Sequence, residues 1–166
     1  MVELKRAPML LVCLGMVLLS GCSPETGSVT GITRNEAGDL EAVVLTCRGT
    51  ADMVGVETDG DPDARTDHVW ETERTRGTLR LPLTREGLQE NELLGTGGFT
   101  AEVVGYDTSH RWNSITVPLT QDILDGLQRG SITYGNPDWG LELRQVDEDE
   151  FANAGCAALQ ETLYDS

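Results

Sequence analysis

The chain has 166 residues, of which 12 are basic and 28 acidic, so its formal net charge is −16 at pH 7. This charge repels nucleic acid and an anionic membrane surface, so neither is expected as a ligand, and any contact with a membrane is expected to come from a lipid anchor alone. Hydrophobic residues make up 39% of the sequence and aromatic residues 5%, which predicts one domain with a thin core and no deep ligand cavity.

The first 21 residues have the pattern of a secretory signal. Lys5 and Arg6 precede an apolar stretch, Met9 to Leu19, which is about half the length that a transmembrane helix needs. The run Leu19-Ser20-Gly21-Cys22 that follows resembles the lipobox of bacterial lipoproteins. The resemblance implies cleavage before Cys22, diacylglycerol on its sulfur, and a domain anchored by lipid on the outer face of the cell membrane. The alternative is an ordinary secretory signal with a chance cysteine.

Residues 22–28 are predicted to be the lipidated cysteine and a short polar tether, and residues 29–166 a single domain. Apolar residues alternate with polar ones along short segments separated by turn-forming residues, which is typical of strands. The predicted strands are Val29–Arg34, Leu40–Cys47, Met53–Thr58, His68–Arg74, Thr78–Leu83, Phe99–Tyr106, Ser114–Leu119, Ser131–Tyr134 and Leu141–Gln145. This many short strands indicates a β-sandwich.

Two helices interrupt the strand pattern. The segment Thr120–Gln128 begins with a capping threonine and has Gly130 just beyond its end, which predicts a short crossover helix. A second helix is predicted from about Glu148 to Leu163, because Asp147 and Glu150 have the spacing of a capping box. The expected fold is therefore mainly β, a β-sandwich-like single domain with a short crossover helix and a C-terminal helix.

The positions of the four cysteines predict different roles for them. Cys13 lies in the signal, Cys22 is assigned to lipid, and Cys47 and Cys156 remain. Cys47 shares a strand face with apolar residues, and Cys156 lies on the apolar stripe of the C-terminal helix. An even pair in an oxidising compartment predicts a disulfide. The alternatives are a two-cysteine metal site and a reactive thiol.

Beyond the lipobox, the chain resembles a group of uncharacterised secreted lipoproteins from high-GC Gram-positive bacteria. The resemblance is carried by the strand Val43–Cys47, the strand-helix-strand segment Ile115–Tyr134, and the closing pair Phe151 and Cys156. It implies the fold and the location, and it brings no activity with it.

One acidic loop has part of the spacing of a calcium-binding loop. Asp59, Asp61, Asp63 and Asp67 occupy positions 1, 3, 5 and 9 of such a loop. However, Ala64 stands where the turn glycine belongs, and no flanking helices are predicted. A solvated acidic hairpin loop is therefore preferred. No cofactor is expected besides the covalent diacylglycerol. Calcium is kept as the alternative, with a calcium-responsive envelope protein as the function that it would imply.

Candidate catalytic residues are few. His68 and His110 are the only histidines, and neither a serine-hydrolase elbow nor a Ser-x-x-Lys box occurs. Acidic residues are so abundant that paired carboxylates carry little information. We expect no enzymatic activity, and a hydrolase that uses acidic residues remains the rival hypothesis.

Three aromatic residues lie in or beside predicted turns, namely Trp112, Tyr134 and Trp139. They are candidates for a patch that binds a sugar or a protein; the alternative is that they cover core edges. Together these observations predict a lipid-anchored, non-catalytic binding or accessory module of the cell envelope. Its expected contacts are the membrane, through the lipid, and an envelope protein.

Overall fold

The computed structural model describes residues 26–58, 68–84, 88–95, 100–107 and 112–164. None of the helices in these ranges is long and apolar enough to cross a membrane.

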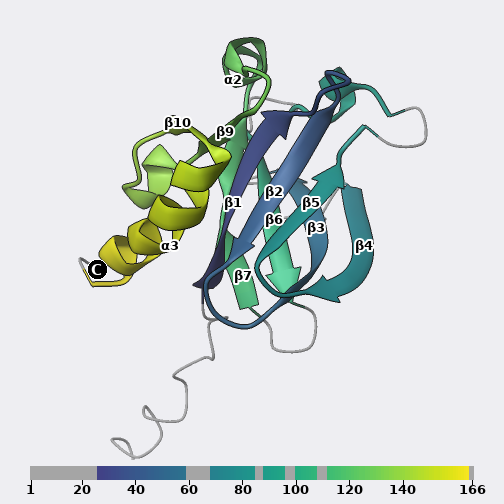
Figure 1. The fold of residues 1–166 in the computed structure, drawn as a ribbon. Coiled ribbons are helices and arrows are strands. Elements are labelled where there is room, and N and C mark those ends of the chain that lie inside the picture. Colours follow the sequence, from purple (N-terminus) through teal and green to yellow (C-terminus); the bar gives the residue numbers. More distant parts are fainter. Residues whose placement is uncertain (1–25, 59–67, 85–87, 96–99, 108–111, 165–166) are drawn as a thin grey trace, which may run out of the picture.

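Figure 1 shows strands folded over one another, with one long helix packed on their side. The strands are β1 (Thr26–Arg34), β2 (Leu40–Thr46), β3 (Ala51–Thr58), β4 (His68–Thr75), β5 (Thr78–Pro82), β6 (Ala101–Asp107), β7 (Trp112–Ile115), β8 (Val117–Leu119), β9 (Ser131–Tyr134) and β10 (Arg144–Asp147). The helices are α2 (Gln121–Gly126) and α3 (Glu148–Tyr164), with 3-10 turns η2 (Glu90–Glu92) and η3 (Pro137–Trp139).

The strands form two packed layers, which confirms the predicted β-sandwich-like fold. One layer has the order β5-β2-β1-β9-β10, and the other contains β7, β8, β6, β3 and β4. All these pairings are antiparallel except that of β1 with β7, which is parallel and connects the two layers. β1 is therefore the central strand, because it borders β2 along one edge and both β7 and β9 along the other.

The main core lies between the layers. Apolar side chains from β1, β2 and β5 meet those from β3, β6 and β8, and all of them are shielded from solvent. Burial of this surface is the main term that favours folding, at roughly 25 cal/mol per Å² of apolar area. The larger members are Ile32, Leu40, Val44, Leu79, Leu81, Val54, Val56, Val103, Val117 and Leu119.

A second apolar cluster lies on the outer face of the β1 layer, under α3. Phe151 and Leu159 of the helix pack there on Val43 and Leu45 of β2, so β2 is buried on both faces. Asp147 caps the helix, since its Oδ1 accepts the Glu150 N–H at 2.8 Å. The helix is also bonded to the sheet through the disulfide of Cys47 and Cys156, the pair that the sequence predicts.

β1 begins three residues before the predicted strand, inside the segment that was predicted to be a tether. Thr26 to Ser28 belong to β1, where Thr26 pairs with Asn113 and Ser28 with Ser114 of β7. The segment has no apolar alternation, so the sequence pattern alone did not indicate a strand. Its pairing partner lies more than 80 positions away in the chain, as the Thr30–Ser114 separation of 84 illustrates.

Other boundaries also differ from the prediction. The segment 114–119 is divided into β7 and β8 at Thr116, because β7 pairs with both β1 and β6 whereas β8 pairs with β6 only. The last strand begins at Arg144 and not at Leu141, since the Leu141 N–H donates to Asn136 O and closes the η3 turn. The helix α2 ends at Gly126, two residues before the predicted Gln128.

Candidate functional site

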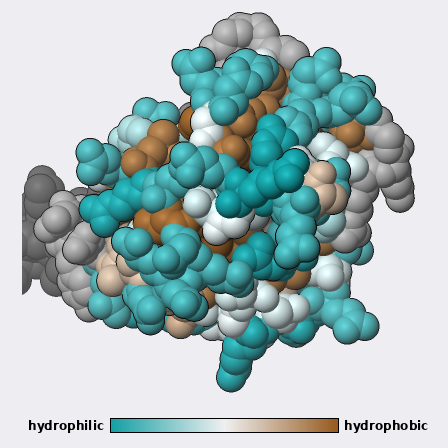
Figure 2. All heavy atoms as spheres, turned by 45° about the horizontal axis from the view of Figure 1, so that its top comes forward, coloured by the Kyte–Doolittle hydropathy of each residue, from teal (hydrophilic) through white to brown (hydrophobic). Residues whose placement is uncertain are grey.

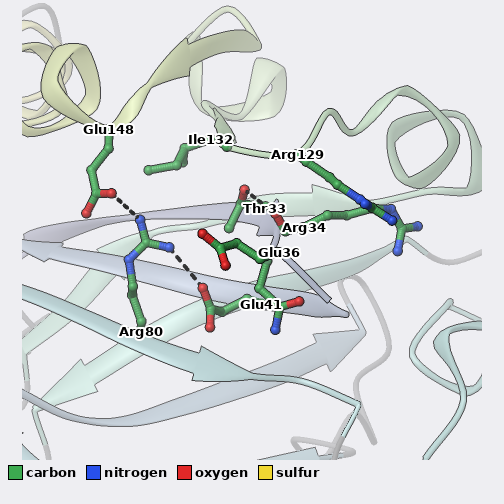
Figure 3. A pocket seen from close by; sticks show the side chains of 10 residues that line it. Thr33, Arg34, Glu36, Glu41, Arg80, Arg129, Ile132 and Glu148 are labelled. Atoms are coloured by element: carbon green, nitrogen blue, oxygen red, sulfur yellow. Dashed lines mark hydrogen bonds and ion pairs between the residues drawn. The ribbon is translucent and has the colours of Figure 1, made fainter. Parts of the chain in front are cut away.

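A groove of about 310 Å³ lies at the end of the domain where the β1–β2 hairpin turns. Its walls come from the end of β1 and the turn after it, from the neighbouring strands β2 and β5, from the start of β9 and the segment before it, and from the start of α3 (Figure 3). Its volume is at the lower end of the range of small-ligand sites. The lining side chains are mainly charged: Thr33, Arg34, Glu36, Glu41, Arg80, Arg129, Ile132 and Glu148.

Arg80 holds two walls of the groove together. Its Nη1 donates to Glu41 Oε2 at 2.9 Å, and its Nη2 lies 2.8 Å from Glu148 Oε2, so β5, β2 and α3 are joined by one guanidinium. Burial alone would lower the pKa of Arg80, but the hydrogen bonds to Glu148 and Glu41 outweigh it and raise that pKa. Because both carboxylates are already engaged, this guanidinium is a structural part of the wall.

Arg34 is neutralised in a similar way. Its two terminal nitrogens donate to the two carboxylate oxygens of Glu90 at 2.6 and 2.9 Å, a bidentate geometry that is specific to arginine. The hydrogen bond from Arg34 lowers the pKa of Glu90, against the opposing effect of burial. Arg34 also donates to Gly38 O at 3.0 Å, which fixes the hairpin turn beside it.

Arg129 differs from both. Its side chain lies over the β1–β2 turn, where its Nη2 would be 3.3 Å from a Cβ at position 38, and Gly38 has a φ of +94°. Glycine thus leaves room for the guanidinium and adopts a backbone conformation that other residues rarely take. Arg129 makes no ion pair with any residue that the structure describes. It is therefore a cation at the groove whose charge is not used within the described fold.

A separate polar cluster is buried between β6, β8 and β9. The Asn136 side chain is fully buried, and its Nδ2 donates to Glu102 Oε1 at 2.8 Å and to Thr116 Oγ1 at 2.7 Å. Glu57 is the cross-strand neighbour of Glu102, and it accepts a hydrogen bond from the Tyr106 hydroxyl. These two glutamates are a pair of adjacent carboxylates, but Oε1 of Glu102 already accepts a hydrogen bond from the buried Asn136 amide.

The structure separates the aromatic residues that the sequence singled out. Tyr134 is 2% exposed and packs edge-on against Phe151 with ring centroids 5.2 Å apart, so it belongs to the core under α3. Trp139 is 41% exposed and lies in η3. Trp112 opens β7, where it pairs with Asp107. Tyr134 is thus a core side chain, in agreement with the alternative that these aromatic residues cover the edges of the core. It cannot form a surface patch with Trp112 and Trp139.

The other predicted site residues fall mostly outside the described ranges. Cys22, His110 and the loop with Asp59, Asp61, Asp63 and Asp67 lie there. His68 begins β4, with its ring centroid 5.9 Å from that of Trp70. Within the described ranges, no group of three or more His, Cys, Asp or Glu side chains could hold a metal ion.

Sequence reasoning did not find the groove. Its arginines come from β1, β5 and the segment before β9, and no local spacing connects them. One signal was available, namely that basic residues are scarce in this chain and that Arg34 and Arg129 both lie next to turn-forming segments.

Comparison with protein-family models, with curated proteins and with solved structures found no match to this chain.

Proposed function

We propose that the chain is a lipid-anchored, non-catalytic binding module on the outer face of the cell membrane. The lipobox Leu19–Cys22 supports the anchor and the location. The disulfide between Cys47 and Cys156 is in keeping with that location, because disulfides persist in oxidising compartments outside the cytoplasm.

The groove at the β1–β2 turn is the binding site of this proposal. The observation that carries it is the guanidinium of Arg129, which has no carboxylate partner among the described residues, beside Arg34 and Arg80 whose charges are satisfied by carboxylates. A free guanidinium binds carboxylate or phosphate groups. In the remaining walls, the exposed Glu36 presents carboxylate oxygens that suit the polar part of a ligand, whereas the buried Thr33 hydroxyl already donates to Ser131 O (Figure 3). The ligand class is a polar envelope molecule with an acidic group, such as a wall glycopeptide.

The lipid anchor is tested by Cys22→Ala. Metabolic labelling with an alkyne fatty acid should label the natural protein and not the variant, and mass spectrometry of the mature natural protein should show diacylglycerol on Cys22. Equal labelling of the two proteins would rule out lipidation at this cysteine.

The binding site is tested with soluble wall glycopeptides as the probe, titrated calorimetrically into the purified lipoprotein in detergent. Binding should be lost or weakened at least tenfold in Arg129→Gln, as expected when a charge-assisted contact of about 1.5–3 kcal/mol is removed. The matched control is Arg144→Gln, since Arg144 is an exposed arginine on β10 outside the groove. Binding that is equal in both variants would remove the groove from the proposal.

A further inference from the structure

The two ends of the sandwich are defined by strand register. β1 begins at Thr26, and the pairings Ser28–Thr46, Leu45–Thr78 and Ala51–Thr75 place three further features at the same end. These are the end of β2, the start of β3 and the turn between β4 and β5. We name this the β1-start end; it is at the bottom of Figure 1, and the groove is at the opposite end, near α2.

Two exposed arginines lie at the β1-start end. The Arg48 N–H donates to Gly27 O at 2.8 Å, so Arg48 is held next to the first residues of β1. Arg76 lies in the turn after β4, where Gly77 O accepts the Thr46 N–H at 2.8 Å. Neither side chain forms an ion pair with a described residue. Their neighbour Arg74 is exposed as well and lies 3.2 Å from Asp52 Oδ2.

Most exposed acidic residues lie at the other end of the domain from these arginines. Among the described residues, they gather around the groove, on α2 and at the start of α3, and Figure 2 shows this face largely covered by hydrophilic residues. They are Glu36, Asp39, Glu92, Asp122, Asp125, Asp147, Glu148, Asp149 and Glu150, whereas the exposed Asp138 and Glu142 lie in and after η3. Among the described residues, exposed acids are therefore fewer at the β1-start end, where Glu73 lies on β4 with Glu71 two residues further from that end, than around the groove.

The sequence limits how far this end could lie from a lipid on Cys22. Three residues, Ser23 to Glu25, separate Cys22 from the first residue of β1. Four Cα–Cα steps span at most about 14 Å in a fully extended chain. This upper limit is less than two Debye lengths, each about 8 Å at physiological ionic strength, so a lipid on Cys22 would bring charges at the β1-start end within range of the surface potential of the leaflet.

We propose that the β1-start end docks on the anionic lipid surface through Arg48 and Arg76, and that the groove faces away from the bilayer. The inference rests on the lipid anchor of the proposed function. Anionic headgroups attract basic residues held near the surface, and they repel the acidic end, so both effects favour the same orientation. The negative net charge of the chain by itself predicts repulsion from anionic lipid. Because the acidic residues gather at the groove end, this repulsion turns that end away from the bilayer.

The experiment measures how fast each arginine reacts with phenylglyoxal, an arginine-selective reagent, in the intact lipoprotein reconstituted in vesicles. Phosphatidylcholine vesicles are compared with vesicles that also contain phosphatidylglycerol, and mass spectrometry reads each site. Arg48 and Arg76 should react several-fold more slowly in the anionic vesicles, and the difference should vanish at high salt. Arg144, on β10, is the internal control and should react equally in both.

Two variants sharpen the result. In the natural protein, the neighbouring Arg74 should also react more slowly in anionic vesicles, and in Arg48→Gln/Arg76→Gln this protection should be lost. In Arg144→Gln, the protection of Arg48 and Arg76 should be unchanged. Equal rates at all arginines on a protein whose Cys22 carries diacylglycerol would overturn the docking surface alone. Absence of the lipid from Cys22 would instead overturn the anchor on which it rests.

Discussion

Cys156, on α3, is bonded to Cys47, the residue that follows β2, with the two Cα atoms 5.4 Å apart and a sequence separation of 109. The bond lies beside Leu45 and Leu159, which pack in the cluster under the helix. It therefore adds a covalent connection to a contact that apolar burial already favours. It also links the C-terminal helix to the strand layer that contains β1 and β2.

Reduction of this disulfide should lower the free energy of unfolding by about 4–5 kcal/mol, since it removes a constraint on a long loop of the unfolded chain. The measurement is urea unfolding with and without reductant. Cys47→Ser/Cys156→Ser is the control, because its unfolding midpoint should not respond to reductant. An unchanged midpoint of the natural protein on reduction would contradict the prediction.

Asn136→Asp should destabilise the fold by about 1–3 kcal/mol at pH 7. The substitution replaces the amide that donates to Glu102 Oε1 with a carboxylate, so two acidic groups would face one another in a buried position. Adding Glu102→Gln should recover part of the loss, because an amide donor then meets the new carboxylate. A double-mutant cycle by chemical unfolding measures the coupling; additive effects would show that the two side chains do not interact.

Gly105→Ala should cost about 1–3 kcal/mol of stability through overpacking. A Cβ at this position would lie 2.6 and 2.8 Å from the two terminal methyl carbons of Val44, on the facing layer. The loss should be smaller in a Val44→Ala background, which removes both methyl groups. Gly126→Ala is the matched control, since a Cβ there meets nothing within 4 Å. Similar losses at the two glycines would refute the packing explanation.

The ion pair of Arg34 and Glu90 should make stability depend on pH. The hydrogen bond from Arg34 lowers the pKa of Glu90 below its ordinary value of 4.5. A lowered folded-state pKa gives stability that is present above the unfolded pKa and is lost as the pH falls through the folded one. Glu90→Gln should therefore be less stable than the natural protein near pH 7 by up to about 1 kcal/mol.

That difference should shrink as the pH falls below about 4.5, the ordinary pKa of the carboxyl. Thermal unfolding of both proteins across this range gives the measurement. Glu92→Gln serves as the control, because Glu92 is exposed on the same turn, accepts the Gln89 N–H and has no arginine partner among the described residues. A difference that stays constant with pH would show that the pair is not the cause.

The sequence by itself determined most of the strands, both helices and the pairing of Cys47 with Cys156. These features follow from local patterns, namely alternating apolar residues, capping residues at Thr120 and Asp147, and the parity of the cysteines. Each depends on residues that are near one another in the chain, or on a count, so no knowledge of the packing was needed.

Only the tertiary structure decided the extension of β1 to Thr26, the break at Thr116, the burial of Tyr134 and the groove around Arg129. The physical reason is common to all four. Pairing of β1 with β7, packing of α3 on β9 and convergence of arginines from separate strands are contacts between distant segments. Local residue patterns do not encode such contacts, because the free energy that selects them comes from burial and hydrogen bonding across the whole fold.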